Sequence, residues 1–138
     1  MALNSDSVDY KKYTEFVNAV TSSESKDYAS FDGRVYELTK DIQVERLLTA
    51  ALGLCAEGGE FTEVVKKIIF QGKPVNDENI FHMKRELGDI CWYLAQACMA
   101  LDTTFDEVIE MNVEKLQARY PGGEFDVHHS ENRKEGDL

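Results

Sequence analysis

Hydrophobic residues recur every three to four positions along most of the chain, which is the periodicity of amphipathic α-helices. No segment shows the strict alternation of a half-buried strand. The expected fold is therefore all-α, a bundle of four to five helices that form a single domain over residues 1–138. Helices are predicted over residues 10–20, 42–70, 77–101 and 105–120, with a further periodic stretch over residues 35–42.

Short signals mark where these helices begin and end. Gly72 and Pro74 suit the end of the long helix, because glycine adopts the C-cap conformation and proline cannot continue a helix. Thr104 and Glu107 have the spacing of a capping box, which predicts Thr104 as an N-cap. The two ends of the chain are polar or charged, so residues 1–9 and 122–138 are expected to be loosely ordered.

The two longest predicted helices each carry an apolar stripe and, on a different edge, acidic residues. We interpret the apolar stripes as the core and expect the acids to lie apart from its deepest part. The second edges carry Gly53, Glu57, Glu60 and Val64 on one helix and Glu86, Asp89, Tyr93 and Gln96 on the other. The apolar stripes are Val44, Leu47, Leu48, Ala51, Leu54, Cys55, Thr62, Val65 and Ile69, then Leu87, Ile90, Cys91, Leu94, Ala97, Cys98 and Leu101.

Gly58 and Gly59 interrupt the first of these helices. Each glycine costs a helix interior roughly 1 kcal/mol relative to alanine. Two interpretations follow: the helix breaks at this point, or the missing side chains let another helix or a ligand approach closely.

The acids form two pairs with i, i+3 spacing, Glu57 with Glu60 and Glu86 with Asp89. On a helix, each pair projects from one face. If the two helices face each other, four carboxylates gather and repel, and a hard divalent cation such as Mg²⁺ would compensate. No His or Cys lies inside either pair, which argues against zinc. A carboxylate-bound Mg²⁺ supports phosphoryl or nucleotidyl transfer.

Other interpretations of the acids stay open. A di-iron bundle would need Glu-x-x-His pairs, which neither pair provides. His82 lies one turn before Glu86 and is either a metal ligand or a partly exposed helix histidine. The acids could also be a solvated cluster on a non-catalytic helical module that binds nucleotides or another protein.

Composition narrows the class of protein. The net charge of −11 disfavours binding to nucleic acid or to an anionic membrane, although a bound cation can still let a nucleotide enter one cleft. The three cysteines do not form a disulfide framework. With no signal peptide at the N-terminus and no apolar run of about 20 residues, we expect a cytoplasmic location.

Three blocks of the sequence, in this order, resemble the MazG-type nucleotide pyrophosphohydrolases of the all-α NTP pyrophosphatase superfamily. The family signature is Glu-x-x-Glu followed by Glu-x-x-Asp on a second helix. Here the first two blocks are Glu57-Gly58-Gly59-Glu60 and Glu86-Leu87-Gly88-Asp89, and the third is Asn112-Val113-Glu114-Lys115 followed by Ala118-Arg119-Tyr120-Pro121. The resemblance covers roughly Leu47 to Pro121.

The resemblance implies hydrolysis of a nucleoside triphosphate to the monophosphate and pyrophosphate, by water attack at the α-phosphorus. It implies a helical bundle that assembles as a homodimer or homotetramer. Mg²⁺ would be the cofactor, with Mn²⁺ as a substitute, and either Glu57 or Glu60 would activate the water. The implied metal ligands are Glu57, Glu60, Glu86 and Asp89, and the implied substrate contacts are Asn112, Lys115, Lys67, Arg119 and Tyr120. The motif does not read a base, so the preferred nucleotide stays open.

Overall fold

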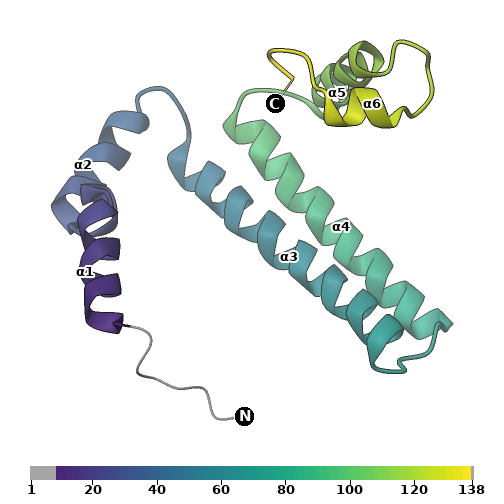
Figure 1. The fold of residues 1–138 in the computed structure, drawn as a ribbon, viewed down its shortest axis with the longest axis horizontal. Helices are drawn as coiled ribbons and strands as arrows, with labels where there is room; N and C mark the ends of the chain where they lie inside the picture. The colour runs from purple at the N-terminus through teal and green to yellow at the C-terminus, as the bar shows by residue number, and fades with distance from the viewer. Residues whose placement is uncertain (1–8, 138) are drawn as a thin grey trace. The chain divides into compact units, whose positions relative to one another are not determined.

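A computed structural model describes residues 9–137, and all the regular structure in that range is helical (Figure 1). The predicted all-α class is confirmed: the described residues form six α-helices and one short 3₁₀-helix, with no strand among them. The chain divides into two compact units, one ending at Asp41 and the other beginning at Ile42. The single domain over residues 1–138 stays a prediction, and residues 1–8 lie outside the described range.

The first unit contains α1 (Tyr10–Val20), the 3₁₀-helix η2 (Ser23–Ser25) and α2 (Tyr28–Leu38). The predicted helix over residues 10–20 is confirmed. The periodic stretch predicted from residue 35 begins earlier, at Tyr28, because Asp27 caps the helix there and accepts a hydrogen bond from the Ser30 N–H at 2.8 Å. Neither α1 nor α2 contains a buried residue.

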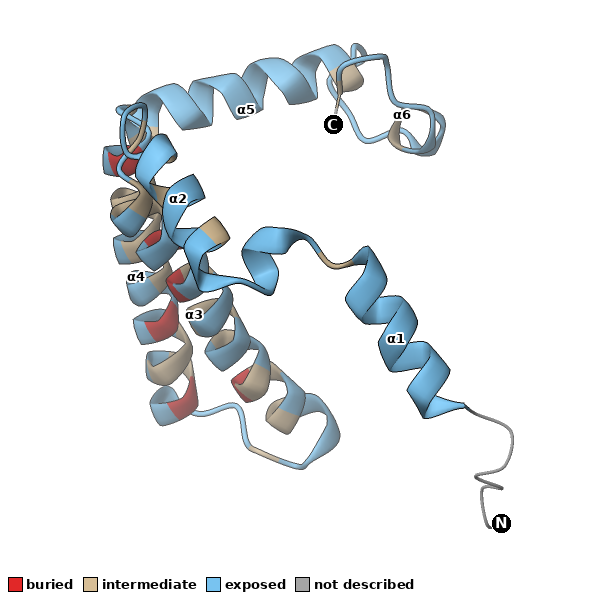
Figure 2. Cartoon of the chain, turned by 90° about the vertical axis from the view of Figure 1, so that its left-hand side faces the viewer, coloured by how far each residue is buried: buried red, intermediate tan, exposed pale blue. Residues whose placement is uncertain are grey.

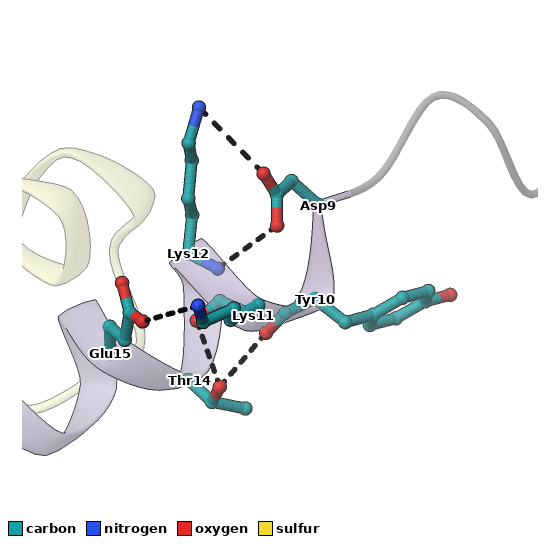
Figure 3. Close-up of polar contacts among 6 residues, drawn as sticks. All are labelled: Asp9, Tyr10, Lys11, Lys12, Thr14 and Glu15. Atoms are coloured by element: carbon teal, nitrogen blue, oxygen red, sulfur yellow. Dashed lines mark hydrogen bonds and ion pairs between the residues drawn. The ribbon is translucent and has the colours of Figure 1, made fainter.

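Local polar contacts hold the start of α1 (Figure 3). The Asp9 carboxylate accepts a hydrogen bond from the Lys12 N–H at 3.1 Å and lies 3.7 Å from the Lys12 ammonium. Lys11 pairs with Glu15 one turn later, at 3.8 Å. Exposed contacts of this kind contribute about 0.2–0.5 kcal/mol each. Lys26 Nζ also donates a hydrogen bond to the Asn18 carbonyl at 2.8 Å, which joins the loop to α1.

The second unit contains four α-helices, and its longest predicted helices are confirmed within two residues at each end. Thr104 is the N-cap of the third of them, as predicted, and its Oγ1 accepts a hydrogen bond from the Glu107 N–H at 3.2 Å. Gly72 adopts a positive φ of 69° beyond the first helix, where few residues other than glycine are stable. The four helices are α3 (Val44–Phe70), α4 (Asp77–Ala100), α5 (Phe105–Arg119) and α6 (Val127–Glu131).

Helices α3 and α4 form an antiparallel hairpin and lie side by side along their length (Figure 1). Arg46 Nη1 donates a hydrogen bond to Gln96 Oε1 at 2.7 Å across the hairpin. The buried residues of the described chain all belong to these two helices (Figure 2). They are Ala50, Gly53 and Val64 on α3 and Asn79, Glu86, Cys98 and Ala100 on α4.

The predicted core stripes hold only in part for the single chain: Cys98 of the α4 stripe is buried, but the other buried residues lie outside the stripes. The buried positions of α3 lie on the edge that also carries Glu57, whereas Leu48 and Ile69 of the apolar stripe are 51% and 64% exposed. On α4, Glu86 is buried and Leu87 is 48% exposed. Small residues on the acidic edge let the two helices approach, and the larger apolar side chains face away from the contact. Of the cysteines, Cys98 is buried, but Cys55 and Cys91 are exposed.

Helix α3 runs through Gly58 and Gly59 without a break. A Cβ atom added at either glycine would meet nothing within 4 Å, so neither is a point of close approach in this chain. The close approach lies one turn earlier, at Gly53, where an added Cβ would lie 2.1 Å from ring carbons of Tyr93. Gly53 therefore makes room for an aromatic ring from α4.

We expect Gly53→Ala to lower the free energy of unfolding by about 1–3 kcal/mol, because the new methyl group would overpack against the Tyr93 ring. Gly59→Ala is the matched control in the same helix, and its higher helix propensity should leave stability unchanged or raise it by up to about 1 kcal/mol. Urea unfolding of both variants tests this. Equal stabilisation by the two substitutions would contradict the close approach at Gly53.

Candidate metal and phosphate site

Three of the four predicted acids come together between α3 and α4. Glu57 lies on α3, and Glu86 and Asp89 lie on α4. One carboxylate oxygen from each lies within 4.8 Å of the others. The contact of Gly53 with Tyr93 is one turn away on both helices, so the same close approach that packs the hairpin brings the acids together.

Glu57 carries the electrostatic consequence of this crowding. Its partial burial, a hydrogen bond with the Glu86 carboxyl and the negative charges of Asp89, Glu86 and Glu60 all raise the pKa of Glu57 above its usual value. The protonated form of Glu57 is therefore more favourable here than it is for an isolated glutamate.

The fourth predicted acid, Glu60, is outside the group of three carboxylates. It lies one turn after Glu57 on α3, is exposed, and contributes to the raised pKa of Glu57 through its charge. The structure thus brings together Glu57, Glu86 and Asp89, and it leaves Glu60 outside that group.

His82 contacts the acid group from one side. Its Nε2 lies 2.8 Å from Glu86 Oε1, one helical turn away. His82 is not one of the three grouped residues, so we describe it as a contact of Glu86 rather than as a candidate metal ligand. It also lines a cavity of about 340 Å³ at the end of the hairpin. The residues around that cavity are Lys73, Glu78, Asn79, Phe81, His82 and Arg85.

The three acids fit a hard divalent cation. They offer only oxygen donors, and burial and the neighbouring negative charges raise the pKa of Glu57. An ion that binds carboxylates would relieve this repulsion. Mg²⁺ and Mn²⁺ prefer such ligands, whereas zinc sites are built mostly from His and Cys. The ion would be held by Glu57, Glu86 and Asp89.

The predicted substrate residues of α5 share a second cavity, of about 470 Å³. Asn112, Lys115 and Arg119 line it, as expected from their i, i+3 and i+7 spacing. The other lining residues come from α5 and from the C-terminal segment, and none of the acid group is among them. They are Met111, Ala118, Lys134, Glu135, Gly136 and Asp137.

The last two predicted substrate residues have local partners. The Lys67 ammonium lies 3.0 Å from Glu63 on the same helix, and the two lysines Lys66 and Lys67 lower the pKa of Glu63. Tyr120 is half-buried, and its ring centroid lies 5.8 Å from that of Phe125. Neither Lys67 nor Tyr120 lines the α5 cavity.

Comparison with known proteins identifies the class of this hairpin. Residues 35–123 match the MazG nucleotide pyrophosphohydrolase domain, a range that contains both acid pairs and all of α5. The chain belongs to the MazG nucleotide pyrophosphohydrolase family. It is also 36% identical over 97 residues to the Gene 37 protein of Mycobacterium phage L5, across 69% of this chain and 85% of the phage protein. No solved structure matches it.

Membership of the MazG family agrees with the resemblance inferred from the three sequence blocks. The match establishes the family of the chain, but it does not identify the nucleotide or the ion. Within residues 9–137, no helix is both long enough and apolar enough to cross a membrane.

The raised pKa of Glu57 predicts how its contribution to stability varies with pH when divalent ions are removed with EDTA. The folded state holds this proton more tightly than the unfolded chain, so the contribution is present at low pH and is lost as pH rises through the folded pKa. Wild type should therefore lose stability relative to Glu57→Gln as pH rises above the unfolded glutamate pKa of about 4.3.

Glu63→Gln is the matched control on the same helix. The pKa of Glu63 is lowered, so its contribution is present above the unfolded pKa and is lost as pH falls. The two variants should give pH slopes of opposite sign in urea unfolding. The same slope for both would contradict the crowded state of Glu57.

Proposed function

We propose that this protein is a Mg²⁺-dependent nucleoside triphosphate pyrophosphohydrolase that converts a ribo- or deoxynucleoside triphosphate to the monophosphate and pyrophosphate. The observation that supports the proposal is that the carboxylates of Glu57, Glu86 and Asp89 lie together, within the residues that match the family. Mn²⁺ would substitute for Mg²⁺, because both accept an all-oxygen ligand set.

In this reaction a water oxygen bonds to the α-phosphorus, and the bond from that phosphorus to the bridging oxygen of the β-phosphate breaks. Pyrophosphate leaves with the bonding electron pair. When bound, the ion supplies charge neutralisation at the phosphate oxygens and lowers the pKa of coordinated water. The chain contributes the carboxylates that hold the ion and cationic side chains that bind phosphate, for which we propose Lys115 and Arg119 with Asn112 beside them.

We propose that Glu60 activates the attacking water. The three grouped acids are needed as ligands, whereas Glu60 lies outside the group, one turn from Glu57, with its carboxylate exposed. An acid that is not used as a ligand keeps its lone pairs for a water molecule. Glu60 would accept the proton of the attacking water as a general base.

We also infer that the active protein is a homodimer or homotetramer. A single hairpin buries few side chains, and large apolar residues on both helices are exposed. A second copy that packs on these faces would complete a bundle of four or more helices and bury them. The exposed residues include Leu48, Leu52 and Ile69 on α3 and Leu87, Trp92 and Met99 on α4.

A panel of ribo- and deoxynucleoside triphosphates, assayed for pyrophosphate and monophosphate with Mg²⁺ and with EDTA, tests the reaction. We expect release that requires the metal and differs among bases. Silence across the panel, from a protein that is folded and oligomeric, would favour a non-catalytic helical module that binds nucleotides or another protein. The three free cysteines fit a reducing compartment such as the cytoplasm, so the assays are best run with a reductant.

Two variants separate metal binding from water activation. Asp89→Asn should lower kcat/KM by about 100-fold or more and abolish the rise in melting temperature caused by millimolar Mg²⁺, since even partners of metal ligands cost 10–100-fold. Glu60→Gln should lose turnover to a similar extent yet keep the Mg²⁺-induced rise. Asp106→Asn, an exposed acid on α5, is the control and should retain both.

The assignment of roles would be wrong if Glu60→Gln abolished the Mg²⁺ response while Asp89→Asn kept it. Full activity in Asp89→Asn would remove the basis for the metal site itself.

For the oligomer, Leu52→Glu places a charge on the exposed apolar side of α3 and should convert the assembly to a smaller species, because burying an unpaired charge is costly. Val75→Glu changes an equally exposed apolar residue in the loop before α4 and should leave the assembly intact. Sedimentation velocity distinguishes the species. A wild-type monomer, or a Leu52→Glu variant that sediments like wild type, would contradict the proposal.

A further inference from the structure

The C-terminal segment places a carboxylate on the cationic residues of α5. Asp137 accepts two hydrogen bonds from Arg119, from Nε and from Nη2, each at 2.6 Å. The Lys115 ammonium lies 3.8 Å from the same carboxylate. The side chains of Arg119 and Asp137 are each only 12% exposed, so this is a well-covered bidentate pair in an otherwise exposed part of the chain.

A bidentate fork of this kind is how arginine recognises phosphate groups as well as carboxylates. Asp137 uses the two donors of Arg119 that a phosphate oxygen pair would use, and it does so inside the cavity that Lys115 and Asn112 also line. A phosphate group and the Asp137 carboxylate therefore cannot both occupy this fork.

We propose that the segment around Asp137 is an internal competitor of the substrate, which closes the Lys115–Arg119 anion site and must be released before a triphosphate can bind there. The proposal rests on the proposed function only in assigning a nucleotide phosphate to these two residues. Inorganic polyphosphate anions, which share that chemistry, should compete with the segment in the same way.

Two observations indicate that the segment around Asp137 can be released, rather than being a permanent structural contact. Residues 134–137 form part of the wall of a cavity of about 470 Å³, so release of the segment would open this cavity to solvent. Residues 131–136 are exposed, so little apolar burial holds the segment in place. The electrostatics agree: the Arg119 guanidinium is the main cause of the lowered pKa of Asp137, so the carboxylate stays charged in neutral solution.

Asp137→Asn tests the competition in the full chain. It should lower KM for the preferred triphosphate by about tenfold with kcat unchanged, which is the factor expected if the site is open in about a tenth of molecules. Asp137→Glu keeps the charge and should retain a KM near that of wild type. Glu135→Gln removes the same charge from the same segment and lines the same cavity, so it controls for general electrostatics and should change KM by less than about twofold.

A second measurement separates failure of this inference from failure of the proposed function. Calorimetric titration with inorganic tripolyphosphate in EDTA needs no turnover, and Asp137→Asn should bind it about tenfold more tightly than wild type. An unchanged or weaker affinity, with a lowered melting temperature, would identify Asp137 as a structural residue and overturn the inference. If Asp137→Asn did not fold, Asp137→Ser would serve in the same titration.

Discussion

The close approach of α3 and α4 is the contact on which the rest of the site depends. It is possible because Gly53 has no side chain where the Tyr93 ring lies, and Ala50 is buried one turn earlier. Because the hairpin is antiparallel, residues one turn later in α3 lie near residues one turn earlier in α4. Those residues are acids, so the packing of small and aromatic side chains sets the distance between carboxylates that would separate if they were free to do so.

Acids in the contact between α3 and α4 lower the stability of the hairpin, although they are the residues that would hold the ion. A hairpin that places Glu57 and Glu86 in its contact, with Asp89 beside them, gives up the apolar burial that the same positions would otherwise supply. Burial and crowding together also raise the pKa of Glu57. A bound cation would reduce the repulsion among these carboxylates. Its affinity would then be linked to the folding of the hairpin.

The sequence was sufficient for the helices but not for their faces. The boundaries of α3, α4 and α5 follow from periodicity, Gly72 and the Thr104 cap, all of which act within one or two turns. Which stripe is buried is decided by the partner, and one chain does not reveal its partner. The stripes with the larger apolar side chains, which include Leu48 and Leu87, are predicted as the core for this reason. The hairpin instead buries the edges that carry Gly53 and Glu86.

The candidate site shows the same division. The spacing of the acid pairs predicted a carboxylate group, and the structure gathers three of the four. The spacing of Asn112, Lys115 and Arg119 predicted one edge, and they line one cavity. No local pattern could reveal that Asp137 reaches back to Arg119, because the segment between them has few apolar residues and the contact is made by two charges far apart in sequence.

Asp137 also lies outside residues 35–123, the range that this chain shares with the MazG family. The matched range therefore contains both acid pairs and Arg119, but not the carboxylate that accepts the two hydrogen bonds of Arg119. Substitution of Asp137 leaves the acid pairs and the hairpin in place. The strength of the proposed restraint could thus be adjusted without changing the residues that would hold the ion.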